Sequence, residues 1–121
     1  MQKISEAEME LMKIIWNYKN PLTSKQIISF IPNNQWKNTT VLTLLSRLIE
    51  KGFLKAERQG RNYLYSYVIS HKEYKKLCSK NFINEFYQGS IKNFFATLYA
   101  DNEISQEDLK ELREMLNKKE E

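Results

Sequence analysis

The first apolar residues of the chain recur every three or four positions: Leu11, Met12, Ile15 and Trp16. This spacing places them on one face of an amphipathic helix, which Asn20–Pro21 is expected to end because proline cannot continue a helix. Ser5, followed three residues later by Glu8, is typical of a capping box, in which each residue bonds the backbone of the other. The sequence therefore predicts a helix that begins just after Ser5.

A second capping box follows at once, formed by Thr23 and Gln26. The residues between this box and Pro32 give a short helix a buried isoleucine face: Ile27, Ile28 and Ile31. The sequence therefore predicts two helices in close succession, each with a marked start and a proline after its end.

Residues 38–51 are expected to form a third helix with two contrasting faces. The apolar face follows the i, i+3, i+4, i+7 rule: Val41, Leu44, Leu45 and Leu48. The opposite face and its flank are mostly polar: Thr39, Thr40, Thr43, Ser46, Arg47, Glu50 and Lys51. The start of this helix is less clearly marked, because Lys37 stands where a capping residue is expected and Asn38 can serve instead. Gly52 is expected to close the helix, because glycine readily adopts the left-handed backbone found there.

Residues 53–58 and 62–68 are rich in aromatic and apolar residues and flank Gln59–Gly60, so they are expected to form a β-hairpin. By the two-residue period of a strand, one face of the second strand carries three tyrosines: Tyr63, Tyr65 and Tyr67. Three helices followed by a hairpin with a basic tip are the order of a winged helix-turn-helix. We therefore expect this fold in residues 1–70.

Helical patterns resume after Ser70 and cover three ranges: 71–88, 91–100 and 106–118. The fold class is thus mainly α with a small β-hairpin. The apolar positions of residues 71–121 are numerous and largely aromatic: Phe82, Phe86, Tyr87, Ile91, Phe94, Phe95, Leu98 and Leu112. A unit of about 50 residues has too much surface for its volume to bury so many large side chains alone. These positions are therefore expected to pack against a second copy, which makes residues 71–121 a dimerisation domain.

The charge is unevenly distributed. Residues 1–70 carry ten Lys or Arg against five Asp or Glu, whereas residues 71–121 carry nine against ten. A basic amino-terminal half favours a polyanion such as double-stranded DNA as its partner. The chain has no apolar run long enough to span a bilayer, and its start does not resemble a signal peptide, so a cytoplasmic location is expected.

The candidate DNA contacts lie on the third helix and at the hairpin: Thr39, Thr40, Thr43, Arg47, Lys51, Arg58 and Arg61. A helix fits the major groove, where its exposed side chains reach base edges, and cations on a hairpin can follow the phosphate backbone. The alternative is that both groups are ordinary solvated surfaces. Leu42 lies beside the polar face and either packs on neighbouring protein or contacts a thymine methyl.

No arrangement of residues supports catalysis. The sequence lacks a nucleophile–base pairing, a glycine-rich phosphate loop and a histidine metal motif, so neither enzyme activity nor a cofactor or metal is expected. His71, the only histidine, is interpreted as a linker or helix-start residue. Cys78, the only cysteine, shares an apolar stripe with Tyr74, Leu77 and Phe82, and we interpret it as a buried structural thiol.

The chain resembles the BlaI/MecI penicillinase-repressor family from about Ile4 to the last helix. Four segments carry the resemblance: ISEAEMELMKIIW, WKNTTVLTLLSRLIEKGFL, QGRNYLYSY and NFINEFYQGSIKNFF. The Thr-x-x-Thr-x-x-x-Arg pattern of Thr40, Thr43 and Arg47 is among its strongest parts. The sequence departs from the family at Lys37–Asn38, where Ser-Pro is common, and at Leu42, where a longer polar residue is common.

The resemblance implies a homodimeric transcriptional repressor on a palindromic operator, controlling β-lactam resistance genes. It also implies release by cleavage in the dimerisation domain, after a membrane protease system senses a β-lactam. The family is cleaved at an Asn-Phe bond, and the matching bond here is Thr97–Leu98. The carboxy-terminal cysteine cluster of copper-responsive relatives is absent from this chain.

Two alternatives remain open at the level of the sequence. A winged helix can serve purely as a protein-interaction module, in which case its third helix needs no free basic and hydroxyl face. A repressor of the same family can also answer a signal other than a β-lactam. Binding to random duplex DNA at two salt concentrations separates the interaction module from either repressor.

Overall fold

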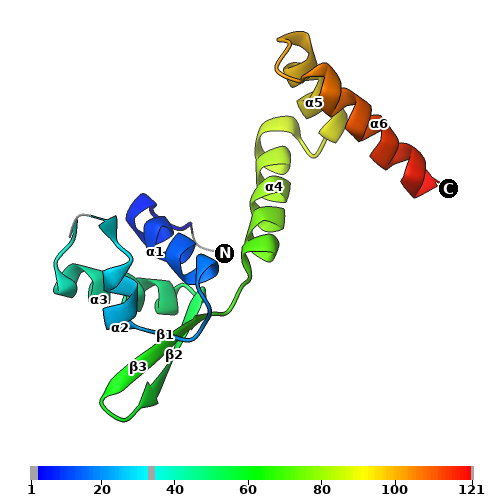
Figure 1. Ribbon diagram of the computed structural model, residues 1–121. Helices are drawn as coiled ribbons and strands as arrows, with labels where there is room; N and C mark the ends of the chain where they lie inside the picture. Colours follow the sequence, from blue (N-terminus) through cyan, green and yellow to red (C-terminus); the bar gives the residue numbers. More distant parts are fainter. Residues whose placement is uncertain (1–2, 33–34, 121) are drawn as a thin grey trace. The chain divides into compact units, whose positions relative to one another are not determined.

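The computed structural model describes residues 3–32 and 35–120, and the chain divides into two compact units, Met1–Tyr74 and Lys75–Glu121. The first unit contains three helices and a three-stranded antiparallel sheet, and its β2–β3 hairpin extends beyond the helices (Figure 1). The second unit is helical. The predicted fold class, mainly α with a small β-hairpin, is confirmed.

Helices α1 (Glu6–Asn17) and α2 (Ser24–Ser29) begin at the two predicted capping boxes. The Ser5 hydroxyl accepts from the Glu8 amide at 3.1 Å, and the Glu8 carboxylate accepts from the Ser5 amide at 2.8 Å. Thr23 and Gln26 repeat this arrangement at α2. Both helix starts are thus fixed by residues three positions apart, which is why the sequence reveals them.

Helix α3 (Asn38–Glu50) buries the predicted apolar face. Its capping position is Lys37, which makes no side-chain cap bond, and Asn38 is not the cap. Its end is better defined. Gly52 is left-handed with φ +88°, its amide donates to Ile49, and the Phe53 amide donates to Leu48, which together form a Schellman motif.

The sheet has the order β1–β3–β2, with strands β1 (Leu22–Thr23), β2 (Leu54–Gln59) and β3 (Asn62–Tyr67). Strand β1 was not predicted, because its two residues form a strand only by pairing with the distant β3. Gln59 pairs with Asn62, so the turn consists of Gly60 and Arg61 and lies one residue later than expected.

The core of the first unit lies between the helices and the base of the sheet. Its completely buried side chains come from all three helices and the segment before β2: Leu11, Met12, Ile15, Ile27, Val41, Leu45, Leu48 and Phe53. Tyr65 is buried, whereas Tyr63 and Tyr67 on the same strand are exposed. Within the hairpin, Leu54 and Tyr65 are held by apolar packing, and the residues towards the tip are exposed.

Trp16 holds the segment that follows the hairpin. Its indole Nε1 donates to the Ile69 carbonyl at 3.0 Å, and its ring stacks on His71 with centroids 4.5 Å apart. Tyr74 lies against the same indole, with ring centroids at 5.4 Å. These contacts explain why the first unit runs past Ser70 to Tyr74.

Three helices make up the remainder of the chain: α4 (His71–Tyr87), α5 (Ile91–Ala100) and α6 (Gln106–Glu120). Phe94 of α5 packs edge-on against two rings of α4, Phe82 at 5.6 Å and Tyr87 at 5.2 Å. Among the described residues, Leu109 is the one apolar residue of the second unit that is buried. The unit thus has an aromatic cluster but no closed core of its own.

Candidate nucleic-acid interface

Helix α3 presents a continuous exposed face opposite its buried stripe. Thr39, Thr43 and Arg47 follow each other at four-residue spacing and are all exposed, with Thr40 and Ser46 beside them. The stripe behind them is at most 5% exposed: Val41, Leu44, Leu45 and Leu48. Because the apolar stripe fixes which side of α3 faces inward, the hydroxyls and the guanidinium are held outward.

Thr43 shows how the hydroxyl groups of this face are prepared. Its Oγ1 donates to the Thr39 carbonyl one turn earlier, at 2.9 Å. The proton of the hydroxyl is therefore used within the helix, and the oxygen of this exposed side chain is left to accept a hydrogen bond. Such a side chain can accept from a base amino group or touch a thymine methyl.

Leu42 lies beside this face and is 44% exposed, so it is not packed away inside the first unit. Packing on neighbouring protein and contact with a thymine methyl were the two interpretations of Leu42 from the sequence, and its exposed part is available to a partner. The i, i+3, i+4 pattern does not distinguish an apolar residue at the margin of a buried stripe from one inside it.

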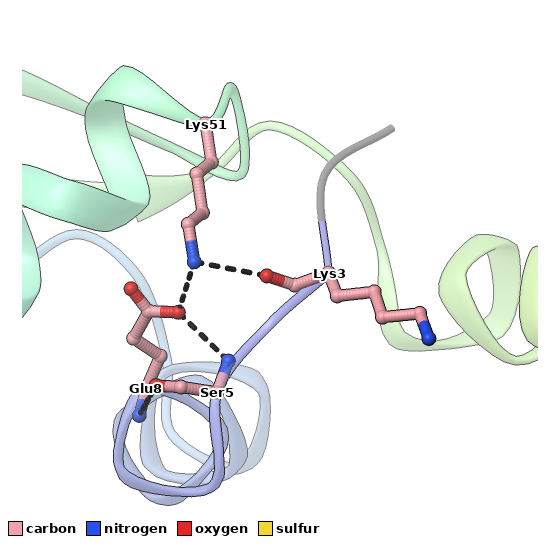
Figure 2. A network of polar contacts seen from close by, with 4 residues as sticks. All are labelled: Lys3, Ser5, Glu8 and Lys51. Carbon is pink, nitrogen blue, oxygen red and sulfur yellow. Dashed lines mark hydrogen bonds and ion pairs between the residues drawn. The ribbon is translucent and has the colours of Figure 1, made fainter.

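Lys51 differs from the other predicted contacts, because the protein itself binds its ammonium group. Lys51 Nζ donates to Glu8 at 2.5 Å and to the Lys3 carbonyl at 2.9 Å, and its side chain is only 20% exposed (Figure 2). We therefore leave Lys51 out of the residues that we propose to contact DNA.

Glu8 remains ionised in this contact. Burial by itself raises the pKa of the Glu8 carboxyl, but the hydrogen bonds from Lys51 and Ser5 and the positive charge of Lys51 outweigh it. The net result is a pKa below the usual range of a glutamate. This pair could not be predicted from the sequence, because Glu8 lies on α1 and Lys51 caps the end of α3, far away along the chain.

The tip of the hairpin carries two exposed arginines, Arg58 and Arg61. The Arg58 Nε donates to the Gly60 carbonyl at 3.1 Å, which draws its guanidinium towards the turn. Tyr63 stands opposite Arg58 in the strand pairing and is 50% exposed. The tip of the hairpin therefore offers two arginines and one phenol to a partner, although Tyr63 was not among the predicted contacts.

The apolar residues expected to mediate dimerisation are all incompletely buried within one chain. The most exposed of them are Ile91 at 71% and Phe86 at 60%. A groove of about 470 Å³ lies between α5 and α6, and its lining includes Ile91, Phe95 and Leu112. The second unit thus exposes a large apolar surface, which is uncommon on proteins that work as monomers.

Comparison with known proteins decides the family. The sequence profile described as penicillinase repressor matches residues 4–118. The chain belongs to the penicillinase repressor family. It is 32% identical to the penicillinase repressor of Bacillus licheniformis over 114 residues, which are 94% of this chain and 89% of that protein. It is 33% identical over 117 residues to the methicillin resistance regulatory protein MecI of Staphylococcus aureus, which are 97% of this chain and 95% of that protein.

Two solved structures resemble the chain. The DNA-binding domain of the repressor BlaI in solution has a TM-score of 0.52 and 35% identity, covering 61% of this chain and 94% of that domain. Monomeric Bacillus licheniformis BlaI, solved with the blaP half-operator, has a TM-score of 0.51 and 34% identity. The match covers 60% of this chain and 89% of that chain. The predicted winged helix is thereby confirmed, and this member of the family is a regulator rather than an enzyme.

The bond that the family resemblance predicts as a cleavage position lies inside a helix. Thr97 and Leu98 belong to α5, where Thr97 Oγ1 donates to the Asn93 carbonyl at 3.1 Å and the Leu98 carbonyl accepts from Glu103 at 3.0 Å. Leu98 is half-buried and lines the groove between α5 and α6. A protease needs the chain extended, so cleavage here requires α5 to unwind locally first.

Two further predictions concern single residues outside this face. Cys78 is exposed on α4, so its interpretation as a buried thiol was wrong for the isolated chain. Phe82 of the same stripe packs against Phe94, whereas Cys78 itself stays exposed, and helical periodicity alone does not distinguish the two positions. His71 is the first residue of α4 and stacks on Trp16, as suits a helix-start residue.

Within residues 3–32 and 35–120, no group of three or more His, Cys, Asp or Glu side chains is placed to hold a metal ion. In the same part of the chain, no helix is both long and apolar enough to cross a membrane.

Proposed function

We propose that this member of the penicillinase repressor family is a transcriptional repressor that binds operator DNA through α3. The observation that carries the proposal is the exposed face of α3, where three threonines and Arg47 stand opposite a fully packed stripe. A helix with such a face fits the major groove of B-DNA. The likeness to BlaI, which was solved with the blaP half-operator, supports the same placement.

The proposed contacts fall into two groups. Thr39, Thr40 and Thr43 meet bases or nearby phosphates, and Arg47, with five donors in a planar fork, reads a base edge, most favourably guanine. Arg58 and Arg61 at the hairpin bind the phosphate backbone. Contacts of the second kind add affinity and fix the position on DNA, but they carry little sequence information.

We propose that the repressor is a homodimer held together by the second unit. The apolar surface around Ile91, Phe86 and the groove between α5 and α6 is expected to be covered by a second copy. A twofold-symmetric dimer presents its two α3 helices to two half-sites related by the same symmetry, so the operator is expected to be a palindrome.

We further propose that the regulated genes are those of β-lactam resistance and that the repressor acts in the cytoplasm. Relatives named penicillinase repressor and methicillin resistance regulatory protein support this assignment. Release would follow cleavage near Thr97–Leu98 by a membrane β-lactam-sensing protease system, since loss of the dimer removes the affinity gained from two linked heads. A repressor that answers a different signal keeps the same DNA contacts and differs in this step.

Selection from a pool of random duplexes with the full chain tests DNA binding directly. The proposal expects a palindromic sequence to be enriched. It also expects the affinity to fall with salt, with a logarithmic slope of about −0.9 for each phosphate neutralised. A pool that stays unenriched and a slope near zero would instead favour a winged helix that binds another protein.

A further inference from the structure

The polar contacts around Glu8 join the start of α1 to the end of α3 (Figure 2). Glu8 Oε1 accepts from the Ser5 amide at 2.8 Å and from the Lys51 ammonium at 2.5 Å. Glu8 is 1% exposed and is the buried charged residue of the described chain. A buried charge is stable only with its partner in place, so the geometry of this ion pair is fixed rather than that of a mobile surface contact.

The backbone transmits the position of Lys51 to the exposed face of α3. The Lys51 amide donates to the Arg47 carbonyl at 2.9 Å, so the lysine that meets Glu8 lies one turn beyond the arginine of the exposed face. The Schellman motif at Gly52 and the completely buried Phe53 keep this last turn rigid. Any displacement of Lys51 therefore moves the turn that carries Arg47.

The remaining contacts of α3 differ in kind from this ion pair. The capping position Lys37 makes no side-chain bond to the start of the helix. The stripe from Val41 to Leu48 packs against the core through apolar contacts, which have no preferred direction. The contact between Glu8 and Lys51, by contrast, is directional, because hydrogen bonds weaken steeply away from their preferred angles.

We propose that Glu8 and Lys51 are positioning residues that hold α3 in the orientation in which Arg47 reaches a base edge. This inference rests on the proposed function, because it takes α3 to be the recognition helix. A binding site of this kind must be held within about 0.5 Å and 10–20° of its productive geometry. Lys51 therefore acts through the orientation of α3 and not as a cation that contacts phosphate.

The variants Glu8→Gln and Lys51→Met and their double variant test this role in the full chain. A matched control is the pair Glu10 and Lys13 on α1, whose charged atoms lie 3.9 Å apart and whose side chains are 56% and 61% exposed. Glu10→Gln and Lys13→Met change the charge identically without touching α3. Thermal melts set a temperature at which every variant is folded.

Two DNA probes separate orientation from general binding. One is a duplex that the wild-type chain enriches from a random pool, and the other is a duplex of random sequence. Each single variant is expected to lose about three- to thirtyfold affinity for the enriched duplex, with unchanged affinity for the random duplex and an unchanged salt slope. The double variant is expected to lose the same affinity for the enriched duplex as each single variant, because all three variants remove the same ion pair between Glu8 and Lys51.

The two controls are expected to bind both duplexes as the wild type does. Lys51→Arg is expected to retain most of the wild-type affinity for the enriched duplex, since a guanidinium can donate to both the Glu8 carboxylate and the Lys3 carbonyl.

Three results would overturn the inference while DNA binding itself stands. The first is wild-type affinity in both single variants. The second is an equal loss on both duplexes. The third is a salt slope that falls by about 0.9 in Lys51→Met but not in Glu8→Gln, which is the behaviour of a phosphate contact. Failure of the wild-type chain to enrich any duplex is a different result, and it overturns the proposed function together with the inference.

Discussion

Arg47 and Lys51 lie one turn apart at the end of α3, yet their charges meet different surroundings. The guanidinium of Arg47 is exposed, whereas the ammonium of Lys51 is bound by Glu8 and by the Lys3 carbonyl. Both were predicted from the sequence to contact DNA. Helical spacing locates a cation on a face, but it does not reveal a carboxylate brought there from another helix, and this is why only the structure separates the two.

The exposed position of Arg47 leads to a first prediction. Arg47→Ala is expected to weaken binding to the enriched duplex by about 1–3 kcal/mol, because a bidentate contact to a base edge is lost. Competition titrations with duplexes altered at single positions should show relaxed specificity at one base pair. Lys13→Ala on α1 serves as the control for loss of one positive charge. Unchanged affinity in Arg47→Ala would show that this residue does not read the operator.

The lowered pKa of Glu8 leads to a second prediction, on stability and pH. A carboxyl with a lower pKa in the folded state than in the unfolded state stabilises the fold above its unfolded pKa. This contribution is lost as the pH falls through the folded pKa. At neutral pH, Glu8→Gln is expected to lower the free energy of unfolding by about 1–3 kcal/mol, because the largely buried Lys51 ammonium loses the negative charge opposite it and keeps only a neutral acceptor.

Urea titrations at neutral pH and well below about pH 4 measure this difference. The difference in the free energy of unfolding between the wild type and Glu8→Gln should be smaller in acid. Glu10→Gln should remain close to the wild type at both pH values. A gap that stays constant or widens in acid would contradict the assignment of the stabilisation to the ionised carboxylate.

The helices of the first unit were predictable to the extent that their signals are local. The capping boxes of α1 and α2 each involve residues three positions apart, and the structure confirms both. Gly52 likewise marks the end of α3. Strand β1 escaped prediction because its pairing with β3 spans some forty residues, from Leu22 to Tyr65. The exposed face of α3 was predicted because periodicity alone determines it once the apolar stripe is known.

The same reasoning gives a prediction for the start of α1. Ser5→Ala removes the hydroxyl that accepts from the Glu8 amide and is expected to cost about 1 kcal/mol of stability. Ser46→Ala makes the same change at an exposed site inside α3 and should be neutral or slightly stabilising, because alanine is the better helix former. Urea unfolding of both variants provides the comparison, and equal losses would argue against a special role for the cap.

At the scale of the whole molecule, the two units differ in how they satisfy their apolar residues. The first unit closes a core around completely buried side chains such as Ile15 and Phe53. The second leaves Phe86, Ile91 and Tyr99 more than half exposed. The sequence already indicated that this unit has more large apolar side chains than it can bury alone. It did not reveal that Cys78 shares the exposed surface, because burial in a partner and burial within one chain leave the same pattern in a sequence.

Ile91 offers the sharpest test of the proposed dimer. It is 71% exposed and borders the groove between α5 and α6, so Ile91→Asp should leave the chain folded while placing a charge in the proposed interface. Sedimentation analysis is expected to show a shift from dimer to monomer. Affinity for a palindromic duplex should then fall by about 10²- to 10⁴-fold, since two linked heads no longer bind together, while affinity for a single half-site stays the same.

Lys92→Asp, at the exposed neighbouring position, makes an even larger change in charge and should remain dimeric. If Ile91→Asp sediments as a dimer and binds the palindrome like the wild type, the surface around Ile91 is not the interface, and the apolar surplus of the second unit must be covered by something other than a second copy.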